Sequence, residues 1–392
     1  MSSSEKMIDV TRMSFPTDMI VGPGATAELP TEVKKLGGTK VLLVSDPGLV
    51  QAGIVQRVEA VLSAAKIPFA RYTGVSKNPI EIDVLEGVES FHANEADLIV
   101  GLGGGGPMDV AKAIRLKVTH PLPLAEYDDL KNGAERIDAD QPPIITIPTT
   151  AGTGSEVGRS SVISLGDDGV KVVIFSPHMM PQTAILDAEL TTGLPPHITA
   201  ATGIDALTHA IEAYVGRGTH PFADMFALSA IARVGTHLEN AVNDGNNIRA
   251  RHEMLLAASA GAISFQKNLG ACHALAHPLS AVAGLHHGLA NALMLPHVIE
   301  YNLEVAASRY AAVDTALNGP QEGSTEARAQ HCLESIWSLM SRLGLPKRLR
   351  DVGVQEDQFE KMVPQAMADA CAPGNPRELT EEAAYALYRA AH

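Results

Sequence analysis

The sequence predicts an α/β N-terminal half with a mainly parallel sheet, followed by an all-α C-terminal half. Up to about residue 195, short apolar runs such as Val41-Leu42-Leu43-Val44 alternate with stretches of helical pattern. This order is typical of strands and helices that build a parallel sheet. Beyond that point the chain is rich in Ala, Leu, Glu and His with helical periodicity. We therefore expect two domains, residues 1–195 and 196–392, which suits a chain of 392 residues.

The expected strands are short apolar runs bounded by glycine, proline or aspartate. Runs without polar alternation indicate strands that are covered on both faces. In chain order they occupy residues 15–21, 39–45, 69–72, 97–102, 143–147 and 184–187, with a hairpin at 162–164 and 171–175. Helices are expected between them at 50–65, 82–94 and 110–116. In the second half they are expected at 199–214, 222–241, 248–264, 272–281, 288–302, 326–342, 355–370 and 380–391.

The composition argues against two classes of partner. The formal net charge is −15 and no stripe of Lys and Arg offsets it, so we expect no binding to nucleic acid. No uninterrupted apolar run reaches the ~18 residues that a membrane helix needs, and residues 1–14 carry no cleavage signal. The widely spaced Cys272, Cys332 and Cys371 make no disulfide framework. Together these features predict a cytoplasmic protein.

Four consecutive glycines, Gly103, Gly104, Gly105 and Gly106, lie between the expected strand at 97–102 and a helix. Glycine lets the backbone present its N–H groups to a ligand, and a helix N-terminus favours an anion. The run therefore predicts a Rossmann-like site for the pyrophosphate of a dinucleotide. It is not the G-x-G-x-x-G sequence of a standard Rossmann turn, and a tight turn that merely uses glycine is the alternative.

A second loop with ligand-binding character follows the expected strand at 143–147. It contains Thr149, Thr150 and two glycines before Glu156. Hydroxyls and glycines at the C-terminal end of a strand suit a nucleotide bound to an open α/β sheet. An ordinary polar loop is the alternative.

The C-terminal half carries acid and histidine at helical spacing. Asp205 and His209 lie four residues apart, so both side chains project from one helix face and can hold one cation. His273 and His277 repeat this spacing, and His287 stands before a glycine. We expect Asp205, His209, His273 and His287 to be the ligands, since one carboxylate and three imidazoles suit a divalent transition metal. For any single histidine, a satisfied core or surface position is the alternative.

These motifs, in their types and their order, resemble those of the iron-containing (group III) alcohol dehydrogenases. The matching segments are Gly203–Glu212, the run through His273, His277 and His287, Gly103–Lys112, Thr149–Val157 and Asn375-Pro376-Arg377. The resemblance covers the chain from Phe15 to about Ala390. It implies the fold that these enzymes share with dehydroquinate synthase, in which an α/β dinucleotide-binding domain precedes a helical metal-binding and catalytic domain.

The resemblance also implies roles for individual residues. In the family, the residues matching Asp205, His209, His273 and His287 hold a divalent metal, usually iron and sometimes zinc. The residue matching His277 lies close to the metal without being a main ligand. The residues implied around the cofactor are Asp46, Gly103, Gly104, Gly105, Gly106, Asp109, Thr149, Thr150 and Lys171.

Two of these positions bear on the choice of cofactor. NAD-using members of the family carry Asp where this chain has Asp46, and a carboxylate there would accept from the ribose hydroxyls and repel the extra phosphate of NADP. The resemblance therefore implies NAD. The family commonly has Ser where this chain has Gly106, so the phosphate site loses a hydroxyl but keeps its backbone donors.

The implied reaction is hydride transfer between NAD(H) and a small alcohol or aldehyde, or a hydroxyacid or ketone, whose oxygen binds the metal. Asp205 and His287 act as metal-holding catalytic residues, and His277 is our candidate proton relay. A His277 that only orients His273 or a water is the alternative. Simple alkanols, diols, lactaldehyde-like compounds and hydroxyacids all remain open as substrates.

Three other functions were weighed against this one. They are a lyase resembling dehydroquinate synthase, a metal-free reductase of the maleylacetate type, and a non-catalytic protein that senses a nucleotide or a metal. Scattered basic residues argue against the lyase, which handles an acidic phosphosugar, and the full set of ligand-type residues argues against the metal-free reductase. By analogy with the family, we expect a homodimer or a higher homo-oligomer that pairs through the N-terminal extended segment.

Overall fold

The computed structural model describes residues 17–166 and 170–392, and the first part of this range forms a six-stranded parallel sheet. The strand order is β1-β8-β5-β4-β2-β3, and every pair is parallel. The strands are β1 (Asp18–Val21), β2 (Val41–Val44), β3 (Phe69–Tyr72), β4 (Leu98–Gly103), β5 (Ile144–Pro148) and β8 (Thr183–Leu186). The start of the first expected strand, residues 15–16, lies outside the described residues.

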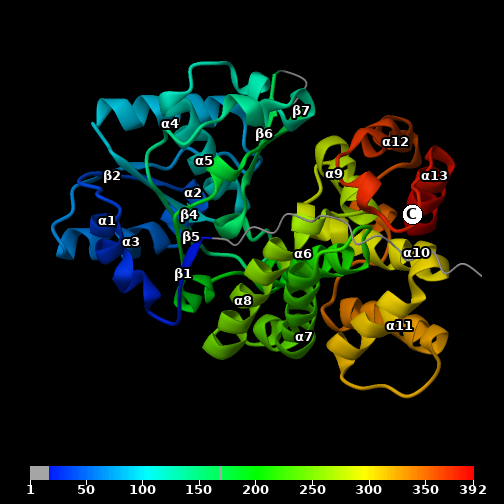
Figure 1. Ribbon diagram of the computed structural model, residues 1–392. Coiled ribbons are helices and arrows are strands. Elements are labelled where there is room, and N and C mark those ends of the chain that lie inside the picture. Colours follow the sequence, from blue (N-terminus) through cyan, green and yellow to red (C-terminus); the bar gives the residue numbers. More distant parts are fainter. Residues whose placement is uncertain (1–16, 167–169) are drawn as a thin grey trace, which may run out of the picture.

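Helices cover both faces of this sheet (Figure 1). The alternation within β2 shows how the layers are built, since Leu42 and Val44 pack with α4 and α5, whereas Val41 and Leu43 pack with α1 and α3. The helices on the two faces are α1 (Leu29–Lys35), α3 (Ile54–Ala64), α4 (Glu81–Ala93) and α5 (Gly105–Thr119). The expected hairpin is present as β6 (Ser160–Leu165) and β7 (Val170–Phe175).

Two expected helices of this half have different limits in the structure. The single helix expected at 50–65 is two helices, α2 (Pro47–Gln51) and α3, because Gly53 between them adopts a φ of +75°. Asp46 and the following proline start α2 rather than forming a simple turn, and Asp46 caps it by accepting a hydrogen bond from Leu49 N. The helix expected to begin at residue 110 begins at Gly105, inside the glycine run.

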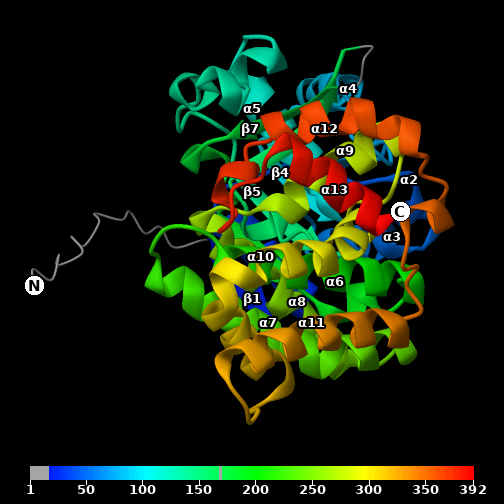
Figure 2. The ribbon, with the colours of Figure 1, turned by 90° about the vertical axis from the view of Figure 1, so that its right-hand side faces the viewer.

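The C-terminal half is entirely helical within the described residues, which confirms the predicted fold class. Its helices are α6 (Pro196–Val215), α7 (Pro221–Asn243), α8 (Ile248–Ser264), α9 (Ala271–Ala283), α10 (His287–Asn318), α11 (Thr325–Arg342), α12 (Phe359–Ala368) and α13 (Glu381–Ala391). The helix expected at 288–302 continues to Asn318, with a kink at Ala306. Figure 2 shows α12 and α13 lying beside α9 and α10, against which they pack.

A shared apolar layer joins the two halves. Leu186 and Ala188, at the end of β8, pack with Leu255, Ala262 and Ile263 of α8. This contact brings the carboxyl end of the sheet against α8, which in turn packs on α6, the helix that carries Asp205 and His209. None of the described helices has the length and apolar character that crossing a membrane requires.

Candidate metal centre

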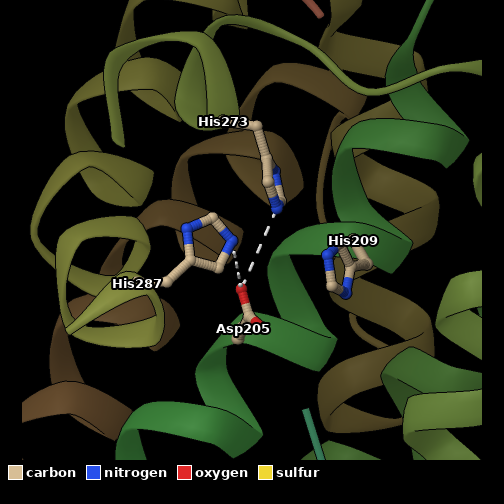
Figure 3. A group of neighbouring side chains, drawn as sticks. All are labelled: Asp205, His209, His273 and His287. Carbon is tan, nitrogen blue, oxygen red and sulfur yellow. Dashed lines mark ion pairs between the residues drawn. The ribbon is translucent and has the colours of Figure 1, made fainter. Parts of the chain in front are cut away.

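The structure brings the four predicted ligands together from three helices. Asp205 and His209 lie one turn apart on α6, His273 lies in the first turn of α9, and His287 is the first residue of α10 (Figure 3). One ligand-type atom of each residue lies within 4.8 Å of those of the other three. Spacing of four residues on one helix therefore did place Asp205 and His209 on one face, as the sequence predicted.

The distances inside the group suit a single cation. Asp205 Oδ1 lies 3.5 Å from His287 Nε2 and 3.8 Å from His273 Nε2. Two ligands that each stand about 2.1 Å from one ion are roughly 3–4 Å apart. The set of donors, one carboxylate and three imidazoles, fits Fe²⁺ and Zn²⁺ alike. The buried Nδ1 of His209 has no hydrogen-bond partner among the described residues, so that atom is not committed to another protein group.

Burial and charge together keep this site in a ligand-ready protonation state. Burial alone would raise the pKa of Asp205, but the neighbouring histidines and a hydrogen bond from Asn291 outweigh it and hold that pKa at about 2. Burial lowers the pKa of His209 to about 4 and that of His287 well below its ordinary value. A charged carboxylate beside neutral imidazoles is the state in which these groups bind a metal.

His273 owes its orientation to Glu212, which is also on α6. Its ring Nδ1 lies 2.6 Å from Glu212 Oε2, and the same carboxylate accepts hydrogen bonds from Cys272 N and His273 N at the start of α9. A proton held at Nδ1 leaves the lone pair of Nε2 free to face the centre. Burial opposes protonation, but the Glu212 contact prevails and raises the pKa of His273 above its ordinary value.

His277 lies beside the ligand group and outside it. Its ring is stacked on that of His287, with centroids 5.3 Å apart. Its Nδ1 lies 2.7 Å from Asp369 Oδ2, in the segment that follows α12. Burial would raise the pKa of Asp369, but the His277 contact and a hydrogen bond from Cys371 N lower it below its ordinary value. The structure thus places His277 next to the four predicted ligands, and its place beside a bound metal stays a prediction.

Seven of the nine residues predicted to bind the cofactor lie at one edge of the sheet. Asp46 follows β2, the glycine run closes β4 and opens α5, and Thr149 and Thr150 follow β5. These three strands are neighbours in the order β5-β4-β2, so their carboxyl ends meet. Thr149 N donates to Gly103 O, which joins the two loops directly.

The other two predicted residues, Asp109 and Lys171, belong to α5 and to β7. The Asp109 carboxylate accepts hydrogen bonds from Ser155 Oγ at 2.5 Å and from Val162 N at 3.0 Å, so it ties α5 to the loop after β5. Lys171 is a half-buried residue of β7, and burial lowers its pKa although the charges of Asp109 and Asp369 oppose this. Nothing in these contacts tests a cofactor role for either residue, and both remain predictions.

The loop after β5 also connects the sheet edge to the metal centre. The backbone of Gly152 lies beside the ring of His209, where it opposes the lowering of the pKa by burial. A Cβ on Gly152 would lie 2.8 Å from Thr202 Cβ on α6, and one on Gly154 would lie 2.2 Å from Ala262 Cβ on α8. Two glycines therefore let this loop pack closely on α6, which carries Asp205 and His209, and on α8.

Sequence reasoning missed three residues that contact this site. Glu212 belongs to the Gly203–Glu212 motif but was given no role, and Asn291 and Asp369 were not singled out. Glu212 lies seven residues after Asp205, and Asn291 lies four residues after His287. Helical spacing from a known ligand was therefore the signal that could have found these two, whereas no local pattern pointed to Asp369.

Comparisons with known proteins identify the chain's relatives. The family model described as iron-containing alcohol dehydrogenase matches residues 16–188, and the one described as Fe-containing alcohol dehydrogenase family, C-terminal, matches residues 199–392. The 4-hydroxybutyrate dehydrogenase of Cupriavidus necator is 39% identical, over 91% of this chain and 93% of its own length. The lactaldehyde reductase of Escherichia coli (strain K12) is 38% identical, over 94% of this chain and 96% of its own length.

Solved structures share the fold as well as the sequence pattern. A crystal structure of 1,3-propanediol oxidoreductase superposes with a TM-score of 0.93 at 37% identity, covering 97% of this chain and all (100%) of that one. An alcohol dehydrogenase from Oenococcus oeni gives a TM-score of 0.93 at 30% identity, covering 98% of this chain and 100% of its own.

Proposed function

The chain belongs to the iron-containing alcohol dehydrogenase family, and we propose that its reaction takes place at the centre formed by Asp205, His209, His273 and His287. It is a metal-dependent oxidoreductase that transfers a hydride between NAD(H) and a small alcohol or aldehyde. The observation that supports this site is the approach of four ligand-type atoms to within 4.8 Å of one another. The matches are to oxidoreductases, which favours hydride transfer over the lyase alternative.

The metal that we propose is Fe²⁺, by family membership, because the donor set itself accepts iron or zinc. Metal analysis of protein purified without oxygen tests the proposal. We expect an equimolar amount of iron that a chelator removes together with the activity, and that added Fe²⁺ restores. Protein that turns over alcohol after complete removal of metal would contradict the proposed centre.

In the proposed reaction, the protein's side chains supply a negative charge at the metal site and fix the orientation of the ligands. When bound, a divalent cation supplies Lewis acidity toward the substrate oxygen, and NAD supplies the hydride acceptor. Asp205 offers a permanent negative charge at the centre, because its pKa is about 2. Glu212 keeps the Nε2 lone pair of His273 toward the site, and the loop after β5 excludes water by packing on α6 and α8.

His277 is the proposed proton relay. Asp369 holds its Nδ1, so Nε2 is the ring nitrogen left to exchange a proton with the substrate oxygen or a water. We expect His277→Ala to lower kcat while the metal content stays normal. If that variant lost the metal instead, His277 would be a ligand or a support of His273.

NAD is the proposed dinucleotide, and Asp46 is the proposed determinant. Asp46 stands at the carboxyl end of β2, and its Oδ1 is engaged by Leu49 N at 3.0 Å. The remaining oxygen can accept from a ribose hydroxyl and repels a phosphate there. Asp46→Gly should raise the use of NADP relative to NAD, at a capping cost of only a few tenths of a kcal/mol. Unchanged preference in steady-state kinetics would remove Asp46 from this role.

For the substrate we propose a short alcohol or aldehyde that carries a second oxygen function. The relatives' names support this class, since they include 4-hydroxybutyrate dehydrogenase, lactaldehyde reductase and 1,3-propanediol dehydrogenase. NAD reduction should be compared with 1,3-propanediol and 4-hydroxybutyrate against 1-propanol and 1-butanol. Higher kcat/KM for the simple alkanols would contradict the proposed class.

We further propose a homo-oligomer located in the cytoplasm. Among the described residues, β1 is an edge strand of the sheet and its Val21 is 37% exposed, which supports pairing of this edge with a second copy. Cys272, Cys332 and Cys371 are free thiols, which suits a reducing compartment. Light scattering should give at least twice the mass of the chain, and a monomer at all concentrations would contradict the pairing.

A further inference from the structure

One buried amide touches three of the four proposed ligands. Asn291, one turn after His287 on α10, is fully buried. Its Nδ2 lies 2.7 Å from Asp205 Oδ1, 3.1 Å from His273 Nε2 and 3.2 Å from His287 Nε2. The three ligands belong to three different helices, so a single nitrogen connects α6, α9 and α10 at the centre.

The surrounding groups determine which end of the amide faces the ligands. Asp205 is a carboxylate, and His273 keeps its proton at Nδ1 beside Glu212, so both present acceptors toward Asn291. At the other end, Cys272 Sγ lies 3.7 Å from Asn291 Oδ1 and 3.4 Å from the Asn291 main-chain oxygen. The S–H group of Cys272 can donate to either of these oxygens. The N–H₂ end therefore points to the ligands.

The number of protons limits what this amide can do. An amide nitrogen carries two protons and meets three acceptors here, so it cannot satisfy all of them. The contact with Asp205 is the shortest, and it is strengthened by the negative charge of the carboxylate. The two imidazole contacts are longer, and they share the second amide proton. A cation could therefore bind the Nε2 lone pairs of His273 and His287 while the hydrogen bond from Asn291 to Asp205 is kept.

We propose that Asn291 is a positioning residue of the metal centre, which aligns Asp205 with His273 and His287 so that the cation meets ligands already in place. This inference rests on the proposed metal centre. Cys272 contributes by fixing the orientation of the amide. Neighbours of this kind around a metal site change affinity by roughly 10–100-fold when they are removed.

The test measures metal affinity rather than turnover. Co²⁺ is titrated into chelator-treated protein, with the dissociation constant obtained by chelator competition and the coordination geometry from the visible spectrum. Asn291→Ala should weaken Co²⁺ binding by roughly 10–100-fold and change the spectrum. Cys272→Ala should weaken it less, because the amide can still donate after losing the contact that fixes its orientation.

Asn302→Ala is the matched control. Asn302 is also a buried amide of α10, and it bonds Asn375 through both ends at 2.9 and 2.8 Å without touching a proposed ligand. This variant should lower the melting temperature and leave Co²⁺ affinity unchanged. If Asn291→Ala does not fold, Asn291→Ser is measured in its place and should show the same weakening.

The outcomes separate this inference from the proposed function. Wild-type affinity and an unchanged spectrum in the Asn291 variants would overturn the role of Asn291 while leaving the centre intact. Equal weakening in Asn302→Ala would show a general effect of helix stability and would also overturn it. Co²⁺ binding that survives His287→Ala unchanged would instead remove the proposed centre, and the inference with it.

Discussion

The two sides of the proposed active site are built from different parts of the polypeptide. At the metal centre, side chains from α6, α9 and α10 supply the charge and the lone pairs, and further buried side chains hold them in place. At the proposed cofactor edge, the glycine run at the start of α5 would supply backbone N–H groups instead. A Cβ on Gly103 would lie 2.7 Å from Pro107 Cγ, and one on Gly105 would lie 2.7 Å from Thr153 Cγ2.

Because of this difference, substitutions on the two sides should cause the loss of different ligands. The metal centre depends on side chains being present, so removing one should release the cation while the dinucleotide still binds. The cofactor edge depends on side chains being absent, so adding one methyl group should weaken the dinucleotide while the metal stays. Variants of the two sides should therefore be separable by measuring both ligands in each protein.

The largest effect is expected from His287→Ala. Loss of a ligand removes the Lewis acid, which is worth several kcal/mol of transition-state stabilisation, so kcat/KM should fall on the order of a thousandfold or more. Metal analysis should show loss of iron, and fluorescence titration should show unchanged NADH affinity. Bound metal with normal turnover in this variant would show that the ligand set is wrong.

Gly103→Ala should produce the opposite pattern. Gly103 adopts a φ of +152°, and an added Cβ would collide with Pro107. Strain of about 1–3 kcal/mol corresponds to a roughly 5- to 150-fold weaker NADH affinity if the loop must shift to bind. Iron content should remain that of the wild type. A variant that lost iron and NADH together would show that the two sides fold as one unit.

Glu212→Gln tests the metal side away from the ligands themselves. Glutamine can accept from one backbone N–H but gives up the charge that holds the His273 Nδ1 proton. Metal affinity should fall by roughly 10–100-fold, with NADH affinity unchanged. Equal metal affinity in chelator competition would mean that His273 is oriented by packing alone.

The pH dependence of metal affinity should probe the metal side without any mutation. Protonated His273 cannot offer its Nε2 lone pair, and its pKa is raised above the ordinary value. Metal affinity should therefore be full above that pKa and fall by about tenfold per pH unit below it. The stability of the metal-free protein should change with pH in the opposite direction. A pKa of His273 that is raised in the folded state adds stability at low pH, and this stability is lost as pH rises through that pKa. Equilibrium dialysis of metal across this range measures the first effect.

The same contrast explains which parts of the site could be predicted from the sequence. Asp205 and His209 were predictable because four-residue spacing on a helix fixes their relative direction. The position of the glycine run at a helix N-terminus was predictable because the run stands between an apolar strand pattern and a helical pattern. Asp46 was placed correctly after β2, but its role as the cap of α2 was not foreseen, because the predicted helix began only at residue 50.

The unpredicted residues depend on contacts between distant segments. His277 meets Asp369 across 92 positions of the chain, and Glu212 meets His273 across 61. Nothing in the neighbourhood of Asp369 marks its carboxylate as a partner of a histidine, because the fold of α12 decides where it lies. Likewise, the break between α2 and α3 depends on the φ of Gly53, which periodicity alone does not determine.

The smallest effect is expected from Gly106→Ser, which adds a side chain where the glycine run has room for one. Unlike Gly103 and Gly105, whose added Cβ atoms would collide at 2.7 Å, Gly106 would place its Cβ 3.2 Å from Pro79 Cγ, and this contact needs only a small shift. The hydroxyl would regain the hydrogen bond that family members with serine can offer to phosphate, so NADH affinity should improve by roughly two- to tenfold. Iron content should not change. Weaker NADH binding would mean that the contact with Pro79 is rigid, and that this glycine, like Gly103, is required for its lack of a side chain.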